Sequence, residues 1–427
     1  MKLIVEDVER ILLRVPFRPR PRPWNELLVG QWSVVEVCRV TAAAADLVGY
    51  GETPLGYVWM PWQVVGDASV ERAVGRNVFE LLGDDTLGIG LQMALYDLAG
   101  KALDVPAHRL FAQPYVRDQV PLAWWSTKMP PEVLAGEAAD AAAAGYRSHK
   151  VKARPWFDVY EQVNAVSAVT PPDYRIELDW NEMLLHPAAA AEVIRELDEN
   201  ERISLYEDPV KRTDAAGQRF LRDRARRPLA THFTREAFPD RLRLDAVDGF
   251  VVDVGGIGNA LHDGLLCAGF EKEFFLQTVG TGLTTALLLH LAAVLTHARW
   301  PAVSAMNVFA DDLLVDPIPV TAGYAAVPDR PGLGVQVDED ALVRLTEGAA
   351  RVLEFPRRLL VFEVPGGPTR TYAGTLQLWT DCRYSGSMPR QARGAHLRVV
   401  TDDGSDDFDR DYRAAERGPG GPGRPLA

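Results

Sequence analysis

Three short apolar runs, YRSHKVKA at 146–153, RIELDWN at 175–181 and RISLYEDP at 202–209, each end in or next to charged or amide side chains. The stretches between them have a helical pattern, for example the Ala-rich amphipathic sequence at 186–199. Strand-like and helical runs that alternate in this way predict parallel β-strands joined by helical crossovers.

The same alternation continues on both sides of these three runs. Five further strands are expected, at residues 121–126, 227–233, 249–256, 273–280 and 302–309. Eight strand–helix units at about 25-residue spacing favour an α/β fold that closes as a (β/α)₈ barrel over residues 119–325. A doubly wound open sheet is the nearest alternative, and we disfavour it because no glycine-rich phosphate-binding motif follows an early strand.

Three further regions flank the predicted barrel. Residues 1–118 begin with Val-rich, strand-like runs and become helical from Ala73 to Leu103, which predicts an N-terminal α+β domain. Residues 326–356 are expected to form a return segment to that domain. Residues 357–427 are an extension with hairpin-like runs at 359–372 and 374–386, predicted to shape an oligomer interface. Its last, Gly- and Pro-rich residues are expected to be disordered.

Composition restricts the possible partners. Acidic residues outnumber basic ones by 59 to 46, which gives the 427-residue chain a formal net charge of −13 and disfavours nucleic acid and anionic membrane surfaces. The longest apolar run, at 282–298, is short and contains two histidines, so no membrane span is expected. Cys38, Cys267 and Cys382 form no metal-ligand spacing and fit a reducing, cytoplasmic location.

Polar side chains gather at the carboxyl ends of the predicted strands, which meet at one mouth in a parallel barrel. Lys150 and Lys152 share a face of one strand, so their like charges favour a lysine whose lowered pKa suits a base. Asp179 and Glu207 end adjacent strands and carry the ligand type that Mg²⁺ prefers. The alternative to a catalytic site is a structural one, in which the lysines are solvated and the carboxylates cap the strand ends.

These motifs resemble those of a known family. KVK at 150–152, DWN at 179–181 and YEDP at 206–209 occur in the order and at the spacing found in the mandelate racemase/muconate lactonizing enzyme branch of the enolase superfamily. GYGET at 49–53 resembles part of that family's N-terminal capping domain. The resemblance implies a barrel whose mouth is covered by loops of the capping domain. It also implies Mg²⁺-assisted abstraction of the proton alpha to a substrate carboxylate, through an enediolate.

By position, the resemblance implies that Lys152 is the base, that Lys150 is its charged neighbour, and that Asp179 and Glu207 are metal ligands. The family's third acidic ligand falls here on His232 or Phe233, with Glu236, a turn further on, as a less favoured substitute; of these we take His232 as the candidate ligand. Imidazole is a better ligand for later transition metals than for Mg²⁺, so Mn²⁺ or another divalent metal is an alternative cofactor. His232 is therefore expected to ligate metal or, instead, to act as an acid.

Two further positions depart from the family pattern. Racemases and dehydratases of the family use an Asp–His pair from the sixth and seventh strands on the face opposite the base. Asp253 and Gln277 are the candidates offered by these two strands here. The acidic residue of the eighth strand is also missing, and Asn307 stands near its position.

Several residues are expected to contact the substrate. Arg18 and Arg20 lie beside Trp24 in a proline-rich loop, and guanidinium groups bind carboxylates in a bidentate manner. A solvated loop stiffened by proline is the alternative. Tyr57 lies in a second capping loop, Asn181 faces the same way as Asp179, and Asn307 stands at the end of the eighth strand.

Sugar-acid dehydration is the activity that these departures affect least, because inversion at one carbon needs a base on each face whereas elimination can proceed with one. The expected protein is thus a metal-dependent lyase that acts on a small carboxylate and forms a homo-oligomer. A racemase or epimerase of a hydroxy or amino acid is the first alternative. A barrel that has lost catalysis and has a binding role is the second.

Overall fold

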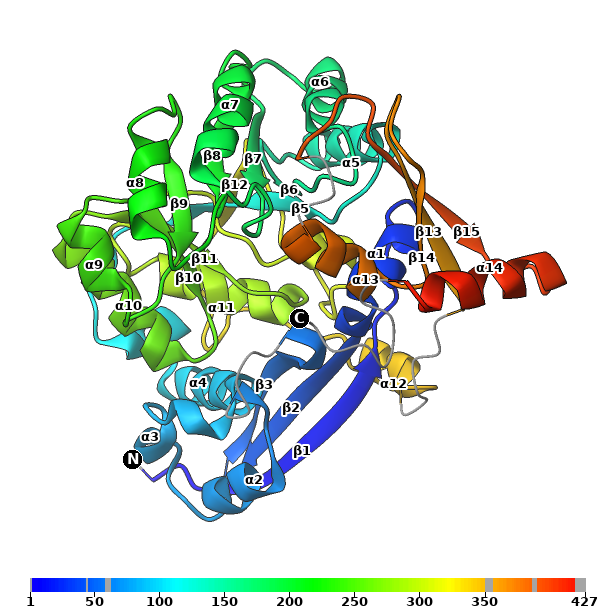
Figure 1. Ribbon diagram of the computed structural model, residues 1–427. Coiled ribbons are helices and arrows are strands. Elements are labelled where there is room, and N and C mark those ends of the chain that lie inside the picture. Colours follow the sequence, from blue (N-terminus) through cyan, green and yellow to red (C-terminus); the bar gives the residue numbers. More distant parts are fainter. Residues whose placement is uncertain (1, 44, 58–62, 350–355, 386–389, 419–427) are drawn as a thin grey trace.

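A computed structural model describes residues 2–43, 45–57, 63–349, 356–385 and 390–418. Figure 1 shows three parts: an N-terminal domain built on strands β1–β3, a central body of parallel strands ringed by helices, and a C-terminal extension with its own small sheet. Residues 419–427, which the sequence suggested would be disordered, lie outside the described residues.

The central body contains seven parallel strands that pair in chain order. They are β5 (Ala123–Ser126), β6 (Ser148–Lys152), β7 (Arg175–Asp179), β8 (Ile203–Glu207), β9 (Leu229–His232), β10 (Gly249–Asp253) and β11 (Glu273–Gln277). The register sets Lys152 beside Asp179, Asp179 beside Glu207, and Asp253 beside Gln277. The carboxyl ends of the strands therefore bring the charged groups of the sequence motifs to one mouth.

Helices cover the outer face of this sheet (Figure 1). They are α5 (Pro131–Ala143), α6 (Val159–Val169), α7 (Pro187–Leu197), α8 (Ala215–Arg222), α9 (Phe238–Arg243), α10 (Ile257–Gly269) and α11 (Gly282–Ala292). The interior is filled by large apolar side chains such as Phe250, Phe274 and Phe275, all fully buried. The body is thus a packed core whose chemistry is confined to its mouth.

The expected eighth strand, at 302–309, is not a regular strand. Ala302 forms a parallel bridge with Leu122, and Val303 forms one with Gln277, so this segment lies between the first and last strands. Ala305 then takes a left-handed conformation, and a 3₁₀ turn follows at Met306–Val308. The barrel-type fold with an N-terminal α+β domain and a C-terminal extension is confirmed, with seven regular strands and an eighth reduced to bridging residues among the described residues.

The N-terminal domain packs an antiparallel sheet of β1 (Val5–Arg14), β2 (Val34–Ala42) and β3 (Ala45–Pro54) against α4 (Ile89–Leu103). An added Cβ at Gly49 or Gly51 would overlap backbone carbonyls of α4, so these two glycines of the GYGET motif allow the close approach. Shorter helices α1 (Arg22–Val29), α2 (Asp67–Ala73) and α3 (Val78–Leu81) complete the domain.

Glu52, from the same motif, joins the N-terminal domain to the barrel. Its buried carboxylate accepts hydrogen bonds from the backbone N–H and hydroxyl groups of Thr281 and Thr284, at 2.8–3.2 Å. These donors lie at the start of α11, where backbone N–H groups have no partner within the helix. One carboxylate thereby fixes β3 over the mouth of the barrel.

The return segment begins with β12 (Tyr324–Ala326), which pairs with β4 (Gln119–Pro121), and contains α12 (Glu339–Thr346). The extension adds β13 (Arg358–Glu363), β14 (Arg370–Tyr372) and β15 (His396–Thr401), with α13 (Thr375–Thr380) and α14 (Asp406–Glu416). The hairpin expected at 359–372 is present. The hairpin-like run predicted at 374–386 was wrong, since Leu378 and Cys382 are spaced to bury one face of a helical turn.

The inner face of the extension packs on its own chain. Leu360, Phe362 and Leu397 share an apolar cluster with Trp156 and Phe157, which follow β6. The cluster also reaches helix α1 of the N-terminal domain. No helix in the described segments has the length and apolar character needed to span a membrane. All three cysteines are buried free thiols.

Candidate active site

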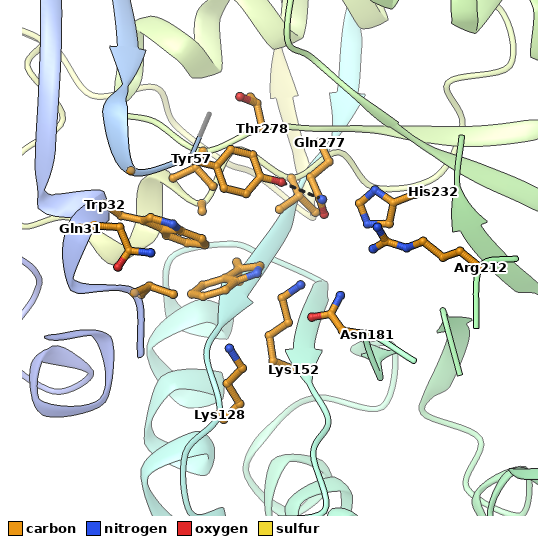
Figure 2. Close-up of a pocket in the computed structure, with 16 residues that line it drawn as sticks. Gln31, Trp32, Tyr57, Lys128, Lys152, Asn181, Arg212, His232, Gln277 and Thr278 are labelled. Carbon is orange, nitrogen blue, oxygen red and sulfur yellow. Dashed lines mark hydrogen bonds between the residues drawn. The ribbon is translucent and has the colours of Figure 1, made fainter. Parts of the chain in front are cut away.

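A cavity of about 280 Å³ opens at the mouth of the barrel, between the strand ends and the N-terminal domain. Five residues singled out from the sequence line it: Lys152, Asn181, His232, Gln277 and Tyr57. Figure 2 shows Lys152 entering from the side of β6, and His232 and Gln277 from the opposite side. The structure therefore places the expected base, Lys152, and one of the two expected opposite-face groups, Gln277, around one space, whereas Asp253 does not line it.

The β6–β8 side of the mouth contains a buried ionic cluster. The Lys150 ammonium is fully buried, 2.5 Å from Glu207 Oε2 and 3.7 Å from Asp179 Oδ2, and it donates to Gln277 Oε1. Lys152 Nζ forms an ion pair with Asp179 Oδ2. The two ammonium groups of β6 thus face carboxylates from β7 and β8.

The two lysines have opposite pKa shifts. Burial acts to lower the pKa of Lys150, but the carboxylates of Glu207 and Asp179 outweigh it and the pKa is raised. For Lys152, burial is stronger than the attraction of Asp179, and the nearby positive charges of Lys150 and Arg154 lower its pKa further. Burial also acts against the charge of Asp179, yet the two lysines hold its pKa well below the usual range. Lys152 is therefore the lysine suited to lose its proton.

The β9–β11 side holds a hydrogen-bonded chain. His232 Nδ1 lies 2.6 Å from Asp253 Oδ2, and Asp253 Oδ1 accepts a bond from Gln277 Nε2 at 3.2 Å. Gln277 Nε2 also donates to the Tyr57 hydroxyl at 3.0 Å. Burial opposes the charge of His232, but Asp253 outweighs it and raises the pKa to about 9. An Asp–His pair is thus present, on the fifth and sixth strands rather than the sixth and seventh.

Buried polar atoms at the junction of the two sides suit a divalent cation. Both carboxylate oxygens of Glu207 and Nε2 of His232 are buried without a hydrogen-bond partner of good geometry, although charged groups approach them. Ligand atoms of Glu207, Asp208 and His232 all lie within 4.8 Å of one another. Asp179 borders this cluster but faces the two lysines. Two carboxylates and an imidazole form a donor set compatible with a divalent metal.

Asp208 contributes more than the sequence analysis assigned to it. Its backbone has a φ of +43°, and its fully buried carboxylate lies 2.7 Å from Arg212 Nε and accepts from the Thr231 hydroxyl at 2.6 Å. The Asp-Pro sequence after β8 marked the end of a strand. It did not reveal that the turn directs Asp208 toward His232.

Two cavity-lining cations, Lys128 and Arg212, were missed. Lys128 follows β5 by two residues, so the rule that strand ends meet at the mouth would have found it. Arg212 lies four residues after Asp208, and no motif marks it. Trp32 and Trp125 form aromatic walls of the cavity between the N-terminal domain and β5, with ring centres 4.8 Å apart and a tilt of 44°.

Four residues expected to contact substrate do not line the cavity. Arg18 pairs with Glu137 of helix α5, and Arg20 lies 3.0 Å from Asp140 of the same helix. These acids attract the arginines away from the cavity, which corrects the prediction. Trp24 packs its ring edge on Phe157 at 5.5 Å. Asn307 exchanges two hydrogen bonds with the backbone of Trp125 and so helps to close the barrel.

Comparisons with known proteins agree with this architecture. A family model described as "Enolase C-terminal domain-like" matches residues 133–341. Arabinonate dehydratase of Saccharolobus solfataricus is 28% identical over 258 residues, which cover 58% of this chain and 69% of that protein. N-succinyl-L-Arg/Lys racemase of Bacillus cereus is 24% identical over 278 residues, which cover 62% and 73%.

A solved enolase from Thermobispora bispora, in complex with magnesium and formate, superposes with a TM-score of 0.66 at 22% identity, covering 82% of this chain and 93% of that one. The structural likeness supports the fold, and the matched family model covers most of the strands that carry the motifs. The resemblance drawn from the KVK, DWN and YEDP motifs is therefore confirmed for the barrel: residues 133–341 match the enolase C-terminal domain-like family, and the fold is that of a solved enolase.

Proposed function

We propose that this protein is a sugar-acid dehydratase in which Lys152 removes the proton alpha to the substrate carboxylate. One observation carries the proposal: the Lys152 side chain ends in the cavity beside a carboxylate from the next strand. Lys152 takes the alpha proton, which leaves an enediolate. The hydroxyl on the neighbouring carbon then departs as water by taking that proton back from the Lys152 ammonium, and the resulting enol tautomerises to a 2-keto acid. The similarity to arabinonate dehydratase supports this type of reaction.

The remaining buried groups stabilise negative charge. Lys150 is enclosed by Glu207 and Asp179, so it serves as a fixed cation beneath the base and not as a second base. Asn181 is held by Arg154 and by Asp179 next to Lys152, where its amide can orient a substrate oxygen. The site thus has one lysine placed for proton transfer and one placed for electrostatic support.

We also propose that Asp179, Glu207 and His232 hold a divalent cation, Mg²⁺ or Mn²⁺. Ligand atoms of Glu207, Asp208 and His232 lie within 4.8 Å of one another, and Asp179 stands beside Glu207 in the strand register. When bound, it would stabilise the negative charge that develops on the substrate carboxylate. His232 is prepared for ligation because its other ring nitrogen bonds Asp253, as second-shell carboxylates do for metal-bound histidines. The magnesium in the Thermobispora enolase supports a metal site in this fold.

Dehydration is favoured over racemisation by the groups opposite Lys152. A racemase needs a base on that face, and Gln277 and Arg212 are not bases at neutral pH. His232 Nδ1 bonds Asp253, and Nε2 faces Glu207 within the proposed metal site, so His232 is assigned to metal ligation and not to a substrate proton. Elimination needs one base, which Lys152 supplies.

The test is turnover of a panel of sugar acids in D₂O with Mg²⁺ or Mn²⁺, followed by NMR. We expect a keto-acid product from at least one acid and its loss in Lys152→Met. Deuterium at the alpha carbon with inversion and no keto acid would instead indicate a racemase. No exchange with any acid would contradict the enzymatic proposal and favour a binding role.

A further inference from the structure

Lys128 is a cavity-lining cation that the proposed reaction does not use. It follows β5, is 9% exposed, and lines the cavity beside Lys152. Figure 2 shows its ammonium end directed into the cavity, while Arg212 enters from the opposite side. Lys128 is thus placed to meet a ligand at the end of the cavity away from Arg212.

The other cations around the cavity have carboxylate partners within the chain. Lys152 pairs with Asp179, and Arg212 lies 2.7 Å from Asp208. Lys128 forms neither an ion pair nor a hydrogen bond with any described residue. Burial, Arg154 and Lys152 all disfavour its charge and lower its pKa. A buried charge without a partner is costly. An anion supplied by a ligand would therefore complete this site, because the described residues provide none.

An aromatic side chain from the extension helps to hold Lys128 in place. The Lys128 ammonium lies 6.0 Å from the centre of the Trp379 ring, and the Arg154 guanidinium lies 5.4 Å from the same ring. Arg154 is anchored by hydrogen bonds to the carbonyls of Ala153 and Asp179. The extension therefore reaches the active site, through a residue in α13 that packs beside the strand bearing the base.

We propose that Lys128 is a specificity-determining residue that binds a second anionic group of the substrate, in addition to the carboxylate next to the reacting carbon. This inference rests on the proposed function, since it assumes that the reacting carboxylate lies at Lys152 and the metal ligands. The second group is a carboxylate or a phosphate, because either accepts hydrogen bonds from a buried ammonium. The preferred substrate is thus an acid with a charge at both ends.

The test compares three probes with the same six-carbon skeleton: gluconate, glucarate and 6-phosphogluconate. Binding is measured by calorimetry in the Lys152→Met background with Mg²⁺ present, so that turnover does not interfere. We expect one or both doubly charged probes to bind at least about tenfold more tightly than gluconate. Glucarate preferred over 6-phosphogluconate would identify a carboxylate, and the reverse order a phosphate.

Lys128→Gln should remove this preference while gluconate affinity changes less than about twofold. Lys128→Arg keeps the positive charge and should retain most of the preference for doubly charged probes. This variant provides the test if Lys128→Gln does not fold. Lys211→Gln, at an exposed lysine, is the matched control and should have no effect. Equal binding of all three probes by the Lys152→Met protein, or an equal loss for all three in Lys128→Gln, would overturn the proposal.

Failure of this inference is distinguishable from failure of the proposed function. Turnover of monoanionic acids without any preference for a second charge would refute the role of Lys128 and leave the dehydratase intact. Tight, Lys128-dependent binding of a dianion by a protein that turns over no acid would support the role of Lys128 and refute the dehydratase.

Discussion

The two sides of the barrel mouth hold their charges in different ways. On the β6–β8 side, Lys150, Asp179 and Glu207 are fully buried and neutralise one another directly. On the β9–β11 side, His232 is hydrogen-bonded to Asp253, and Asp253 accepts a hydrogen bond from Tyr57 of the N-terminal domain. The first side is a closed ionic cluster that supports the base. The second is a chain of hydrogen bonds that reaches the domain covering the site.

Breaking the closed cluster should have the largest effect. Lys150→Met leaves Glu207 and Asp179 buried side by side without their shared cation. Removal of one partner from a buried ion pair costs about 3–5 kcal/mol, so we expect the free energy of unfolding in EDTA to fall by that amount, measured by urea denaturation.

Two variants make this result specific. Lys211→Met, at an exposed lysine, should change stability by less than about 0.5 kcal/mol. The double variant Lys150→Met/Glu207→Gln should recover part of the lost stability, because the Glu207 charge that Lys150→Met leaves unpaired is also removed. A Lys150→Met protein as stable as the parent would show that the cluster is not closed.

The second prediction concerns the hydrogen-bonded chain. Asp253→Asn removes the charge that raises the pKa of His232 to about 9, so burial should dominate and the pKa should fall below the usual value of about 6.5. Histidine NMR titration of the metal-free protein measures this, with His232→Gln to assign the signal. A pKa that stays near 9 in Asp253→Asn would contradict the role of Asp253.

The same pair gives a pH dependence of stability with a defined sign. The pKa of His232 is raised on folding, so its contribution is fully present below pH of about 6.5 and is lost as pH rises through about 9. The difference in unfolding free energy between the parent and Asp253→Asn should therefore be largest near pH 6 and shrink toward pH 9. A difference that grows with pH would exclude this account.

These two sides also differ in how far the sequence could predict them. Lys152, Asp179 and Glu207 end consecutive strands, and the parallel register that brings them together follows from the barrel pattern alone. The pairing of His232 with Asp253 depends on side-chain directions at two strand ends, which periodicity does not specify. Asp208 is directed by a left-handed turn residue, a local backbone feature with no sequence marker at a non-glycine position.

Residues from distant segments were the hardest to place. Arg18 and Arg20 looked like carboxylate ligands because the acids that bind them, on α5, are more than 100 residues away. Trp379 reaches Lys128 and Arg154 only because the extension packs on the loop after β6. Such contacts depend on how domains dock, and the strand and helix patterns that predict the barrel carry no information about docking.

The fourth prediction concerns the metal site, where the two sides meet. His232→Gln should weaken Mn²⁺ binding by about 100-fold, and Asp253→Asn, which removes the second-shell carboxylate, by about tenfold. Calorimetric titration with Mn²⁺ measures both, and His262→Gln, at an exposed histidine, is the control. Unchanged Mn²⁺ affinity in His232→Gln would assign the metal to the carboxylates of the β6–β8 side alone.

The smallest effect is expected where the hydrogen-bonded chain reaches the N-terminal domain. Tyr57→Phe removes the hydroxyl that bonds Gln277 and Asp253 but keeps the ring that packs edge-on against Trp32 at 5.4 Å. A hydrogen bond of this kind contributes about 0.5–1.5 kcal/mol, so kcat/KM for an accepted acid should fall about two- to tenfold. Tyr115→Phe, at a partly exposed tyrosine outside the cavity, should leave kcat/KM unchanged. If Tyr57→Phe instead abolished turnover, the hydroxyl would have to act on the substrate itself, and the β9–β11 side would extend its chemistry into the covering domain.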